Sequence, residues 1–438
     1  MSEINNLKQE ILELKQKLQE YKKIYGKLPE ASQLLERGQP NLNSQILTND
    51  EIKRYGRQLI LPDLRYSGQL KLKNAKVLVV GAGGLGSPAL LYLSTAGVGR
   101  LGVVDHDTLD LSNLPRQVIH PTRNVDKSKA ESAKQTILSL NPNIIVDTYT
   151  ELFDSSSALK IVEKYDIVLD CTDNVATRYL INDCCVLLNK PLISGSALKL
   201  HGQLTIYNYK GGPCYRCLYP KPPPPETVTN CSDGGVLGPV TGIIGCFQAL
   251  EAIKMIIDNF EYNPSLVIFS ADRSQYFTQV KLRSKKLNCA VCGTKPTITE
   301  LIDYVQFCSS GPMDKSLNLK VLGKEDRISC LEYNKIQQSK EDHILIDVRE
   351  DVQFEICQLP NSINIPLNKL EKELDTIHSK YDTKTPFYFL CRLGNDSQLA
   401  VAIYKRYLNE KGEDRVIKDI QGGLLSWTNE VDKDFPIY

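Results

Sequence analysis

The sequence predicts an α/β protein built as two domains, because buried strands alternate with helices in two separate stretches of the chain. In the N-terminal stretch, a glycine-rich turn joins the first strand to a helix. In the C-terminal stretch, a loop that begins with a cysteine joins a strand to a helix. The length of 438 residues also fits two or three domains of ordinary size.

The composition excludes several classes of protein. Lys and Arg total 53 and Asp and Glu total 52, so the formal net charge is +1 and no basic field favours nucleic acid or an anionic membrane. No uninterrupted run of about eighteen apolar residues occurs, and the polar start MSEINNLKQE lacks the apolar core of a signal peptide. We therefore expect a soluble, cytoplasmic protein whose 13 cysteines stay reduced.

Residues 1–50 precede the first domain and begin with a short amphipathic helix. Its apolar side chains recur at alternating spacings of four and three, as in a coiled-coil seam: Leu7, Ile11, Leu14, Leu18 and Tyr21. Three heptads are short, so docking on the same chain and dimerisation both remain open. A polar connector leads to a second helix start near Thr48.

The first domain is expected at residues 51–293. Strands are predicted from residue 76, at 101–105 and at 166–171, with helices after Gly86 and at 127–140. PLISGSA and GQLTIYNY look like further strands, GIIGCFQALEAIKMIID like a helix, and a last strand-like piece ends at NCAVCG. The run KPPPPETVTNCSDGG is a loop, because proline lacks a backbone donor and fixes an extended backbone.

The second domain is expected at residues 328–438, after a weakly patterned linker at 294–327. Strands are predicted at HILIDVRE, INIPL and FYFLC, a helix at SQLAVAIYKRYL, and the domain closes with GGLLSW. The five histidines show no metal-ligand spacing, and we assign them no role.

The glycine-rich turn predicts a phosphate site. Gly81, Gly83 and Gly86 form G-x-G-x-x-G between strand and helix, where bare amides and the helix N-terminus can bind phosphate. Asp105 ends the next strand, where a carboxylate can bond a ribose hydroxyl. Alone, these residues would indicate an NAD-dependent oxidoreductase, which remains the alternative.

Charged residues after the glycines favour a triphosphate instead. Arg116 and Lys129 are cations that can neutralise phosphates, and the strand DIVLDCTDN presents Asp173 and Asn174 at its end, where Asp173 can bind Mg²⁺. A nicotinamide site would not need them.

Two C-x-x-C pairs predict a structural zinc site. Each pair places two sulfurs on one side of a turn, and two pairs complete a tetrahedron with no position open to substrate. A redox dithiol is the alternative, although neither pair opens a helix after a strand. The four ligands are Cys214, Cys217, Cys289 and Cys292.

Two further cysteines are candidate nucleophiles. Cys231 lies in the polar, proline-rich loop, where a thiol has little use in packing. Cys391 ends the strand FYFLC and opens the loop CRLGNDS, whose amides and following helix N-terminus are expected to lower the thiol pKa. Ser397 stands where tyrosine phosphatases have Arg, so phosphatase chemistry is disfavoured. The other seven cysteines are interpreted as small hydrophobic residues.

The order of these motifs resembles a known family. RYGRQLILP, GAGGLG, VVDHDTLDLSNLPRQVIH, KSKAESA, LDCTDN and TRYLIND follow one another as in the ubiquitin-activating and molybdopterin-synthase-activating adenylyltransferases. CRLGNDS, with LIDVRE before it and GGLLSW after it, looks like a rhodanese domain. Together they resemble the eukaryotic two-domain adenylyltransferases and sulfurtransferases that activate the ubiquitin-related modifier.

The resemblance implies a Rossmann-like, ATP-binding adenylation domain with a structural zinc, followed by an α/β rhodanese domain. It also implies a homodimer in which Arg57 of RYGRQ reaches the nucleotide of the partner subunit. The ATP contacts that it implies are Gly84, Asp105, Ser112, Asn113, Arg116, Lys129, Asp173, Asn174 and Arg57.

The implied activity is adenylation of the C-terminal glycine of a ubiquitin-like sulfur carrier by Mg-ATP, followed by sulfur transfer that forms a thiocarboxylate. In that scheme Cys231 captures the acyl group or takes part in sulfur transfer, and Cys391 carries a persulfide. The family uses the product for 2-thiouridine in tRNA and for protein conjugation. The donor would be a cysteine desulfurase or another sulfurtransferase, with no direct contact to nucleic acid or membrane.

Overall fold

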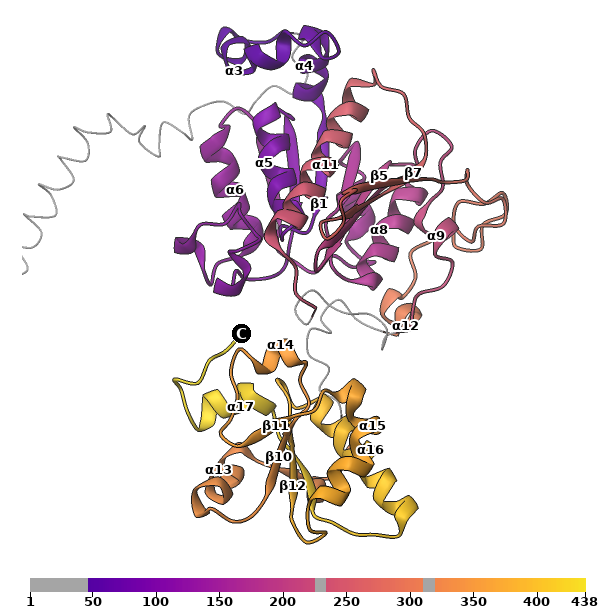
Figure 1. The fold of residues 1–438 in the computed structure, drawn as a ribbon. Helices are drawn as coiled ribbons and strands as arrows, with labels where there is room; N and C mark the ends of the chain where they lie inside the picture. Colours follow the sequence, from indigo (N-terminus) through magenta and orange to yellow (C-terminus); the bar gives the residue numbers. More distant parts are fainter. Residues whose placement is uncertain (1–45, 225–233, 310–319) are drawn as a thin grey trace, which may run out of the picture. The chain divides into compact units, whose positions relative to one another are not determined.

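The computed structural model describes residues 46–224, 234–309 and 320–438. The predicted N-terminal amphipathic helix and Cys231 lie outside the described residues. The chain divides into two compact units, Met1–Ser310 and Gly311–Tyr438, and each is described by itself (Figure 1).

The first unit contains an eight-stranded sheet with the order β3-β2-β1-β4-β5-β6-β7-β8. The pairs from β3 to β5 are parallel, and the pairs from β5 to β8 are antiparallel. Its strands are β1 Lys76–Val80, β2 Arg100–Val104, β3 Ile145–Tyr149, β4 Ile167–Asp170, β5 Leu192–Leu198, β6 His201–Tyr207, β7 Ser265–Ser270 and β8 Phe277–Lys281.

Helices cover both faces of the parallel strands. The alternating side chains of β1 divide between two cores, with Val77 and Val79 in one and Leu78 and Val80 in the other. The helices are α3 Asn49–Leu59, α4 Arg65–Asn74, α5 Gly86–Ala96, α6 Lys129–Leu140, α7 Ala158–Val162, α8 Val175–Leu187, α9 Tyr215–Leu218, α11 Gly238–Ile257 and α12 Tyr304–Cys308. Residues of α5, α6 and α11 line the first core, and residues of α7 and α8 line the second (Figure 1).

Local sequence explains where several helices begin. The Thr48 hydroxyl oxygen accepts a hydrogen bond from the Glu51 amide, and the Glu51 carboxylate accepts one from the Thr48 amide. This pair of bonds is a capping box at the predicted start of α3. Among the described residues, α11 is the one helix whose length and composition would allow it to cross a membrane. It packs against α5, β5 and β6, so it is the core helix of this unit.

Two segments differ from the sequence-based expectation. The piece ending at NCAVCG is not a strand, because its backbone bonds locally, from Cys289 to Lys286 and from Gly293 to Cys289. Within the expected linker, residues 304–308 form α12, and the Tyr304 hydroxyl donates to Asp183 at 2.8 Å. The first unit therefore extends past the second cysteine pair.

The second unit is a five-stranded parallel sheet with the order β11-β10-β12-β13-β9. Phe387 and Phe389 of β12 point into one core with α15 and α16, whereas Tyr388 and Leu390 point into another with α13 and α17. The elements are β9 Arg327–Ile328, β10 Ile344–Asp347, β11 Ser362–Asn364, β12 Phe387–Leu390, β13 Ile417–Ile420, α13 Cys330–Ser339, α14 Asp351–Phe354, α15 Leu367–Lys380, α16 Asp396–Lys411 and α17 Gly423–Glu430.

Candidate functional site

The glycine turn, residues 81–86, leads from β1 into α5 at the carboxyl edge of the parallel strands. Gly81 has φ +98°, and a Cβ there would lie 2.7 Å from the Cys171 carbonyl oxygen. A Cβ at Gly86 would lie 1.9 Å from the Gly81 carbonyl oxygen. In the described part of the chain no side chain caps the N-terminus of α5. Its first amides can therefore bind an anion.

Asp105 fixes the shape of this turn. Its carboxylate accepts the Ala82 amide at 2.8 Å through one oxygen and the Asp107 amide at 2.9 Å through the other. A carboxylate has further lone pairs, so Asp105 can also accept a ribose hydroxyl as the sequence predicts.

The predicted cations lie on neighbouring segments. Lys129 begins α6 and is only 6 % exposed, and its ammonium group lies 2.8 Å from a carboxylate oxygen of Asp107. Arg116 is half-buried and donates to the Ser112 carbonyl at 2.9 Å. Sequence reasoning missed Asp107, which holds Lys129 beside the end of β2.

Ser112 and Asn113 lie in the short 3₁₀ helix Leu111–Asn113. The side chain of Asn113 accepts the Asp110 amide at 3.1 Å, and Asp110 accepts the Ser112 amide at 2.8 Å. This capping box fixes the segment that leads to Arg116.

Asp173 and Asn174 follow β4, next to the glycine turn through the close approach of Gly81 and Cys171. Asp173 is exposed. Asn174 caps α8 by accepting the Thr177 amide at 2.8 Å. Asp173 can therefore accept a ligand, whereas the side-chain oxygen of Asn174 already has a structural partner.

A buried ion pair stabilises the loop that follows β4. Asp170, at the end of β4, is fully buried and accepts Nε of Arg178 at 2.9 Å and the Ser194 hydroxyl at 2.7 Å. Arg178 also donates to the Thr172 carbonyl at 3.1 Å. The sequence motifs LDCTDN and TRYLIND contain both residues but do not show that they pair.

His120 is a second residue that sequence reasoning missed. Its Nε2 lies 2.9 Å from the Ala82 carbonyl oxygen, which can only accept, so Nε2 carries the proton. Burial lowers the pKa of His120, so the ring stays neutral and Nδ1 accepts from the Ser132 hydroxyl at 3.0 Å. His120 thus links the glycine turn to α6, which carries Lys129.

Two buried polar atoms near the turn fit a polar ligand. Gln117 Oε1 and Ser87 Oγ have no hydrogen-bond partner among the described residues. Gln117 lies near Gly83, where a Cβ would come within 3.6 Å of its amide nitrogen, and Ser87 lies in the first turn of α5. Buried polar groups normally find partners, so these atoms are suited to a nucleotide.

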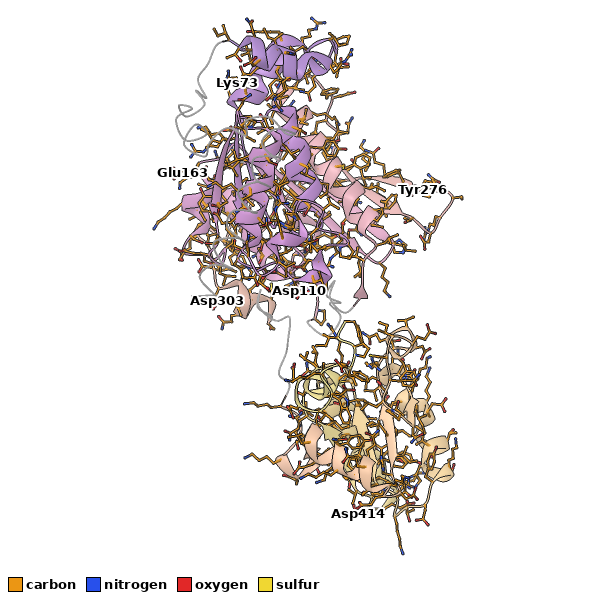
Figure 2. The ribbon with its side chains drawn as sticks, turned by 90° about the vertical axis from the view of Figure 1, so that its left-hand side faces the viewer. Lys73, Asp110, Glu163, Tyr276, Asp303 and Asp414 are labelled. Atoms are coloured by element: carbon orange, nitrogen blue, oxygen red, sulfur yellow. The ribbon has the colours of Figure 1, made fainter. Side chains whose placement is uncertain are left out.

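Arg57 lies at the other end of the unit. Its neighbours on α3 contact the C-terminal end of α5, since Gln58 donates to the Ala96 carbonyl at 3.1 Å and Tyr55 lies against Gly97. The glycine turn is at the opposite end of α5, about 16 Å away for an 11-residue helix. Figure 2 likewise shows Lys73 of α4 and Asp110 at opposite ends of this unit.

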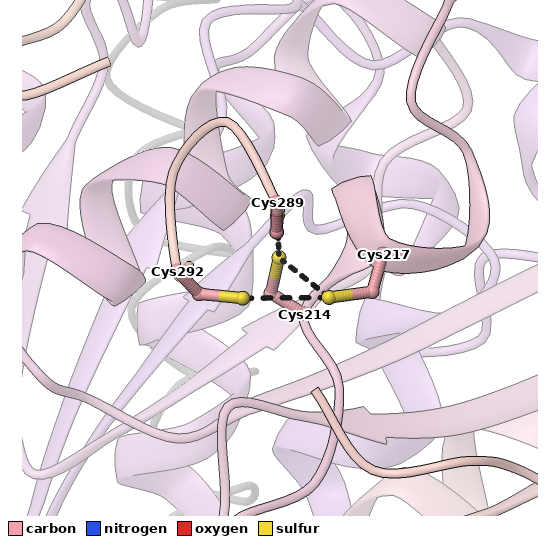
Figure 3. A group of neighbouring side chains, drawn as sticks. All are labelled: Cys214, Cys217, Cys289 and Cys292. Atoms are coloured by element: carbon pink, nitrogen blue, oxygen red, sulfur yellow. Dashed lines mark hydrogen bonds between the residues drawn. The ribbon is translucent and has the colours of Figure 1, made fainter. Parts of the chain in front are cut away.

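The four cysteines of the two C-x-x-C pairs come together. Their sulfurs all lie within 4.8 Å of one another, with separations of 3.8 Å for Cys214–Cys217, 3.6 Å for Cys214–Cys289 and 3.4 Å for Cys217–Cys292 (Figure 3). A tetrahedral zinc with Zn–S bonds of about 2.3 Å requires S–S separations of about 3.8 Å. The donor set and its geometry therefore fit zinc.

A buried network fixes the first cysteine pair. Arg216, between Cys214 and Cys217, pairs with Asp183 of α8 through two hydrogen bonds of 2.8 Å. Its guanidinium lies 4.4 Å from the ring centre of Phe307 on α12. The amide of Lys286 donates to the Cys217 sulfur at 3.3 Å. This outer layer orients the sulfurs.

The second unit contains the Cys391 loop, residues 391–395, between β12 and α16. Cys391 is 2 % exposed, the Gly394 amide donates to its sulfur at 3.1 Å, and its thiol donates to Ser397 at 3.4 Å. No side chain in the described residues caps α16 at its N-terminus. The loop can therefore stabilise an anionic sulfur.

The expectation for the Cys391 pKa is wrong. Burial raises the pKa of the Cys391 thiol, and the carboxylate of Asp396 adds to this, while Ser397 and the loop amides act in the opposite direction. The loop sequence shows the amides but does not show how completely the sulfur is buried.

Five of the seven remaining cysteines are buried and two are partly exposed, so most are packing residues as predicted. The buried ones are Cys171, Cys184, Cys185, Cys308 and Cys330, and the others are Cys246 and Cys357.

Two family models match the chain. The ThiF family matches residues 55–291, and the rhodanese-like domain matches residues 331–430. The ThiF match includes the glycine turn and most of the cysteine cluster, and the rhodanese-like match includes the Cys391 loop.

Curated relatives match over both units. "Adenylyltransferase and sulfurtransferase MOCS3" of Culex quinquefasciatus is 49% identical over 100% of this chain and 99% of that protein. The protein of the same name from Aedes aegypti is 52% identical over 90% of each chain. That of Drosophila virilis is 52% identical over 90% of this chain and 86% of its own length.

A solved structure, Escherichia coli MccB with MccA-N7isoASN, covers 56% of this chain and 76% of its own, with TM-score 0.50 and 24% identity. At this level the likeness shows the fold of the first unit alone.

Proposed function

The chain belongs to the ThiF family, among the two-domain adenylyltransferases and sulfurtransferases, and from this premise we propose how its two units divide the reaction. The first unit uses ATP to adenylate the C-terminal glycine of a ubiquitin-like sulfur carrier. The second unit supplies the sulfur that converts this glycine to a thiocarboxylate.

One observation carries the proposal. The same chain contains two strand–loop–helix turns whose helix N-termini are not capped by a side chain in the described residues, one lined by glycine and one holding a buried thiol. The first is suited to the phosphates of an external ligand, and the second is suited to a sulfur that the protein itself carries.

In the first step, a carrier carboxylate oxygen attacks the α-phosphate of ATP, a P–O bond forms, and pyrophosphate leaves. Lys129 and Arg116 stabilise the negative charge that develops on the phosphates, while the amides of the glycine turn bind them. The exposed carboxylate of Asp173 would bind the Mg²⁺ that accompanies ATP, and this ion would screen the charge. The proposed contacts are Gly84, Asp105, Ser112, Asn113, Arg116, Lys129, Asp173 and Asn174, with Arg57 supplied by the partner subunit of a homodimer.

The position of Arg57 supports an active site shared between two copies. Its own glycine turn lies at the far end of α5, so a contact between Arg57 and nucleotide requires a second chain.

In the second step, the outer sulfur of a Cys391 persulfide attacks the activated acyl carbon, and AMP or the Cys231 thiolate leaves. The Cys231 thiolate is the leaving group if Cys231 has first captured the acyl group as a thioester. The Cys231 thiolate then attacks Cys391, which releases the thiocarboxylate and leaves a Cys231–Cys391 disulfide. A cellular dithiol must reduce this disulfide before the next cycle.

The cysteine cluster is proposed to hold one structural zinc per subunit. Zinc would link the α9 turn to the segment after β8 and would have no position open to substrate. Metal analysis of the purified chain, with Cys246→Ser as the control for Cys217→Ser, should show one zinc that only the cluster variant loses.

The proposed context is cytoplasmic. The thiocarboxylate would serve 2-thiolation of tRNA uridine and protein conjugation, with sulfur from a cysteine desulfurase or another sulfurtransferase. The formal net charge of +1 fits an enzyme that passes on a protein carrier and does not bind tRNA itself.

ATP–pyrophosphate exchange tests the proposal. Exchange should require both the chain and a ubiquitin-like carrier with a C-terminal glycine, and NAD should have no effect. Exchange that is absent with every such carrier, together with NAD-dependent turnover, would favour the oxidoreductase alternative that Asp105 and the glycines leave open.

A further inference from the structure

The segment after α17 brings Tyr438 to the Cys391 loop. Asp432 bonds back to the Trp427 carbonyl at 3.1 Å, and the Thr428 hydroxyl donates to the Phe435 carbonyl at 3.4 Å. The Phe435 side chain packs against the core beneath α17. These contacts fix the path of the segment within the second unit.

Tyr438 contacts two arginines. The guanidinium carbon of Arg392, the residue directly after Cys391, lies 5.2 Å from the centre of the Tyr438 ring. Arg349 donates from its guanidinium to the Tyr438 hydroxyl at 2.7 Å. One phenol therefore joins a side chain of the Cys391 loop to a side chain at the end of β10.

Arg349 is a fixed anchor. It is 2 % exposed, forms bonds of 2.9 Å and 2.6 Å to the Asp347 carboxylate, and donates to the Cys357 carbonyl at 2.7 Å. Since β10 pairs with β12, this anchor belongs to the same sheet that carries Cys391. Asp347 neutralises Arg349, so its contribution here is geometric.

The backbone of the Cys391 loop does not depend on Tyr438. The amides of Leu424 and Leu425 donate to the Cys391 and Arg392 carbonyls at 3.0 Å and 3.1 Å. Because α17 fixes the backbone in this way, the phenol ring acts on the Arg392 side chain.

We propose that Tyr438 is a positioning residue of sulfur transfer, which orients the guanidinium of Arg392, the residue directly after Cys391, to bind an anionic oxyacid group. This inference rests on the proposed sulfur-transfer function of Cys391. Two substrates offer such a group: the sulfonate end of a thiosulfate-type donor, and the phosphate of the carrier adenylate. An aromatic face attracts a guanidinium and limits the directions in which it can point.

Thiosulfate and cyanide provide the first test on the full-length chain. The Cys391 thiolate attacks the outer sulfur of thiosulfate, the S–S bond breaks and sulfite leaves; cyanide then removes the outer sulfur as thiocyanate and restores the thiolate. Tyr438→Ala removes ring and hydroxyl, and Tyr438→Phe removes the hydroxyl alone. Tyr407→Ala is the matched control, because Tyr407 stacks under Lys411 at 4.8 Å and its hydroxyl donates to Asp375 in the same unit.

For Tyr438→Ala we expect the KM for thiosulfate to rise about 5- to 10-fold, as loss of a cation–π contact predicts, with kcat within about 2-fold of wild type. Tyr438→Phe should change KM by less than about 3-fold, and Tyr407→Ala should leave it unchanged. An unaltered KM for thiosulfate in Tyr438→Ala, together with unimpaired transfer to the adenylated carrier in the second measurement below, would overturn the proposal. So would an equal rise of KM in Tyr407→Ala. Melting curves of all three variants distinguish a folding defect from a loss of anion binding. A folding defect would lower kcat and leave KM unchanged.

A second measurement identifies the source of the anion. Cys391 is loaded with persulfide, and single-turnover thiocarboxylate formation is measured with adenylated carrier. A slower turnover in Tyr438→Ala assigns the contact to the adenylate phosphate, and a defect confined to thiosulfate assigns it to the donor. A wild-type chain that transfers no sulfur in either assay would contradict the proposed function itself, whereas an active wild type with an unimpaired Tyr438→Ala would contradict only the role of Tyr438.

Discussion

The glycine turn and the Cys391 loop are built alike and differ in where their anion comes from. Each follows a central parallel strand and leads into a helix without a side-chain cap in the described residues. In the glycine turn, Asp105 and His120 fix the Ala82 peptide, and the backbone packs too closely at Gly81 and Gly86 to admit a Cβ. The described part of the chain supplies no anion to the amides there, so the anion must be a ligand. In the Cys391 loop, the Gly394 amide already points at a sulfur of the chain.

This difference explains the surroundings of the two turns. A triphosphate arrives fully charged, so its site needs cations near the amides, the role that we propose for Lys129 and Arg116. A buried thiol must acquire its charge in place, and burial raises the pKa of Cys391. The same backbone arrangement is therefore suited to binding a charged ligand in one unit and to stabilising a sulfur of the chain itself in the other.

The largest expected effect is that of a substitution that abolishes the activity of one unit and leaves the activity of the other unchanged. Cys391→Ser should abolish thiocarboxylate formation, because a hydroxyl cannot carry a persulfide, while ATP–pyrophosphate exchange stays at the wild-type rate. Mass spectrometry of the carrier and an exchange assay measure the two outcomes. Thiocarboxylate formed at the normal rate by this variant would remove Cys391 from the mechanism.

The converse change should affect the glycine turn alone. Lys129→Ala removes a cation that we propose to act on the phosphates, and it should slow adenylation by about 10²- to 10³-fold, as for other groups that stabilise transition-state charge. Transfer from thiosulfate to cyanide should be unchanged. Lys134→Ala on the same helix is the control, and an equal loss in that variant would mean that α6 is merely destabilised.

A smaller effect is expected at His120, which forms a hydrogen bond to the backbone of the glycine turn. His120→Ala removes the bonds to Ala82 and Ser132 and should raise the KM for ATP about 10-fold, the effect of roughly one lost hydrogen bond. His120→Gln can restore a donor to Ala82 and an acceptor for Ser132, so it should recover most of the affinity. Steady-state kinetics would contradict this role if Gln and Ala behaved alike.

The smallest expected effect of a substitution concerns Ser397, which acts on the pH dependence of the Cys391 loop. Because the thiol pKa lies above its ordinary value, about 8.5 in the unfolded chain, the rate of persulfide formation should rise about tenfold per pH unit from pH 7 to pH 8. Ser397 helps to lower this pKa, so Ser397→Ala should raise it further.

The Ser397→Ala rate at pH 7 should therefore fall by about 3-fold. Ser426→Ala, at a partly exposed serine of α17, is the control. A pH-independent rate would show that deprotonation of Cys391 does not limit the step.

The local features of the fold could be predicted from the sequence. Buried strands such as DIVLDC, the glycines of the turn and the start of α3 at Thr48 depend on patterns within a few residues. The two C-x-x-C pairs also predict that they meet across 71 intervening residues, because a closed tetrahedral metal site needs four ligands and each pair offers two.

Features that depend on tertiary contact could not be predicted. The pairing of Asp107 with Lys129, the link from His120 to Ala82 and the burial of Cys391 each join segments that only the folded sheet brings together. NCAVCG has the apolar residues and cysteines that are typical of a buried strand. In the structure its two cysteines belong to the cysteine cluster, and its backbone forms turns.

Intact mass spectrometry of the carrier tests the central claim most directly. A ubiquitin-like carrier is incubated with the wild-type chain, ATP, Mg²⁺, a sulfur donor and a dithiol reductant. The carrier mass should increase by the difference between one sulfur and one oxygen atom, and only when ATP and Cys391 are both present. A carrier that keeps its original mass while ATP–pyrophosphate exchange proceeds, or that gains sulfur without ATP, would contradict the division of work between the two units.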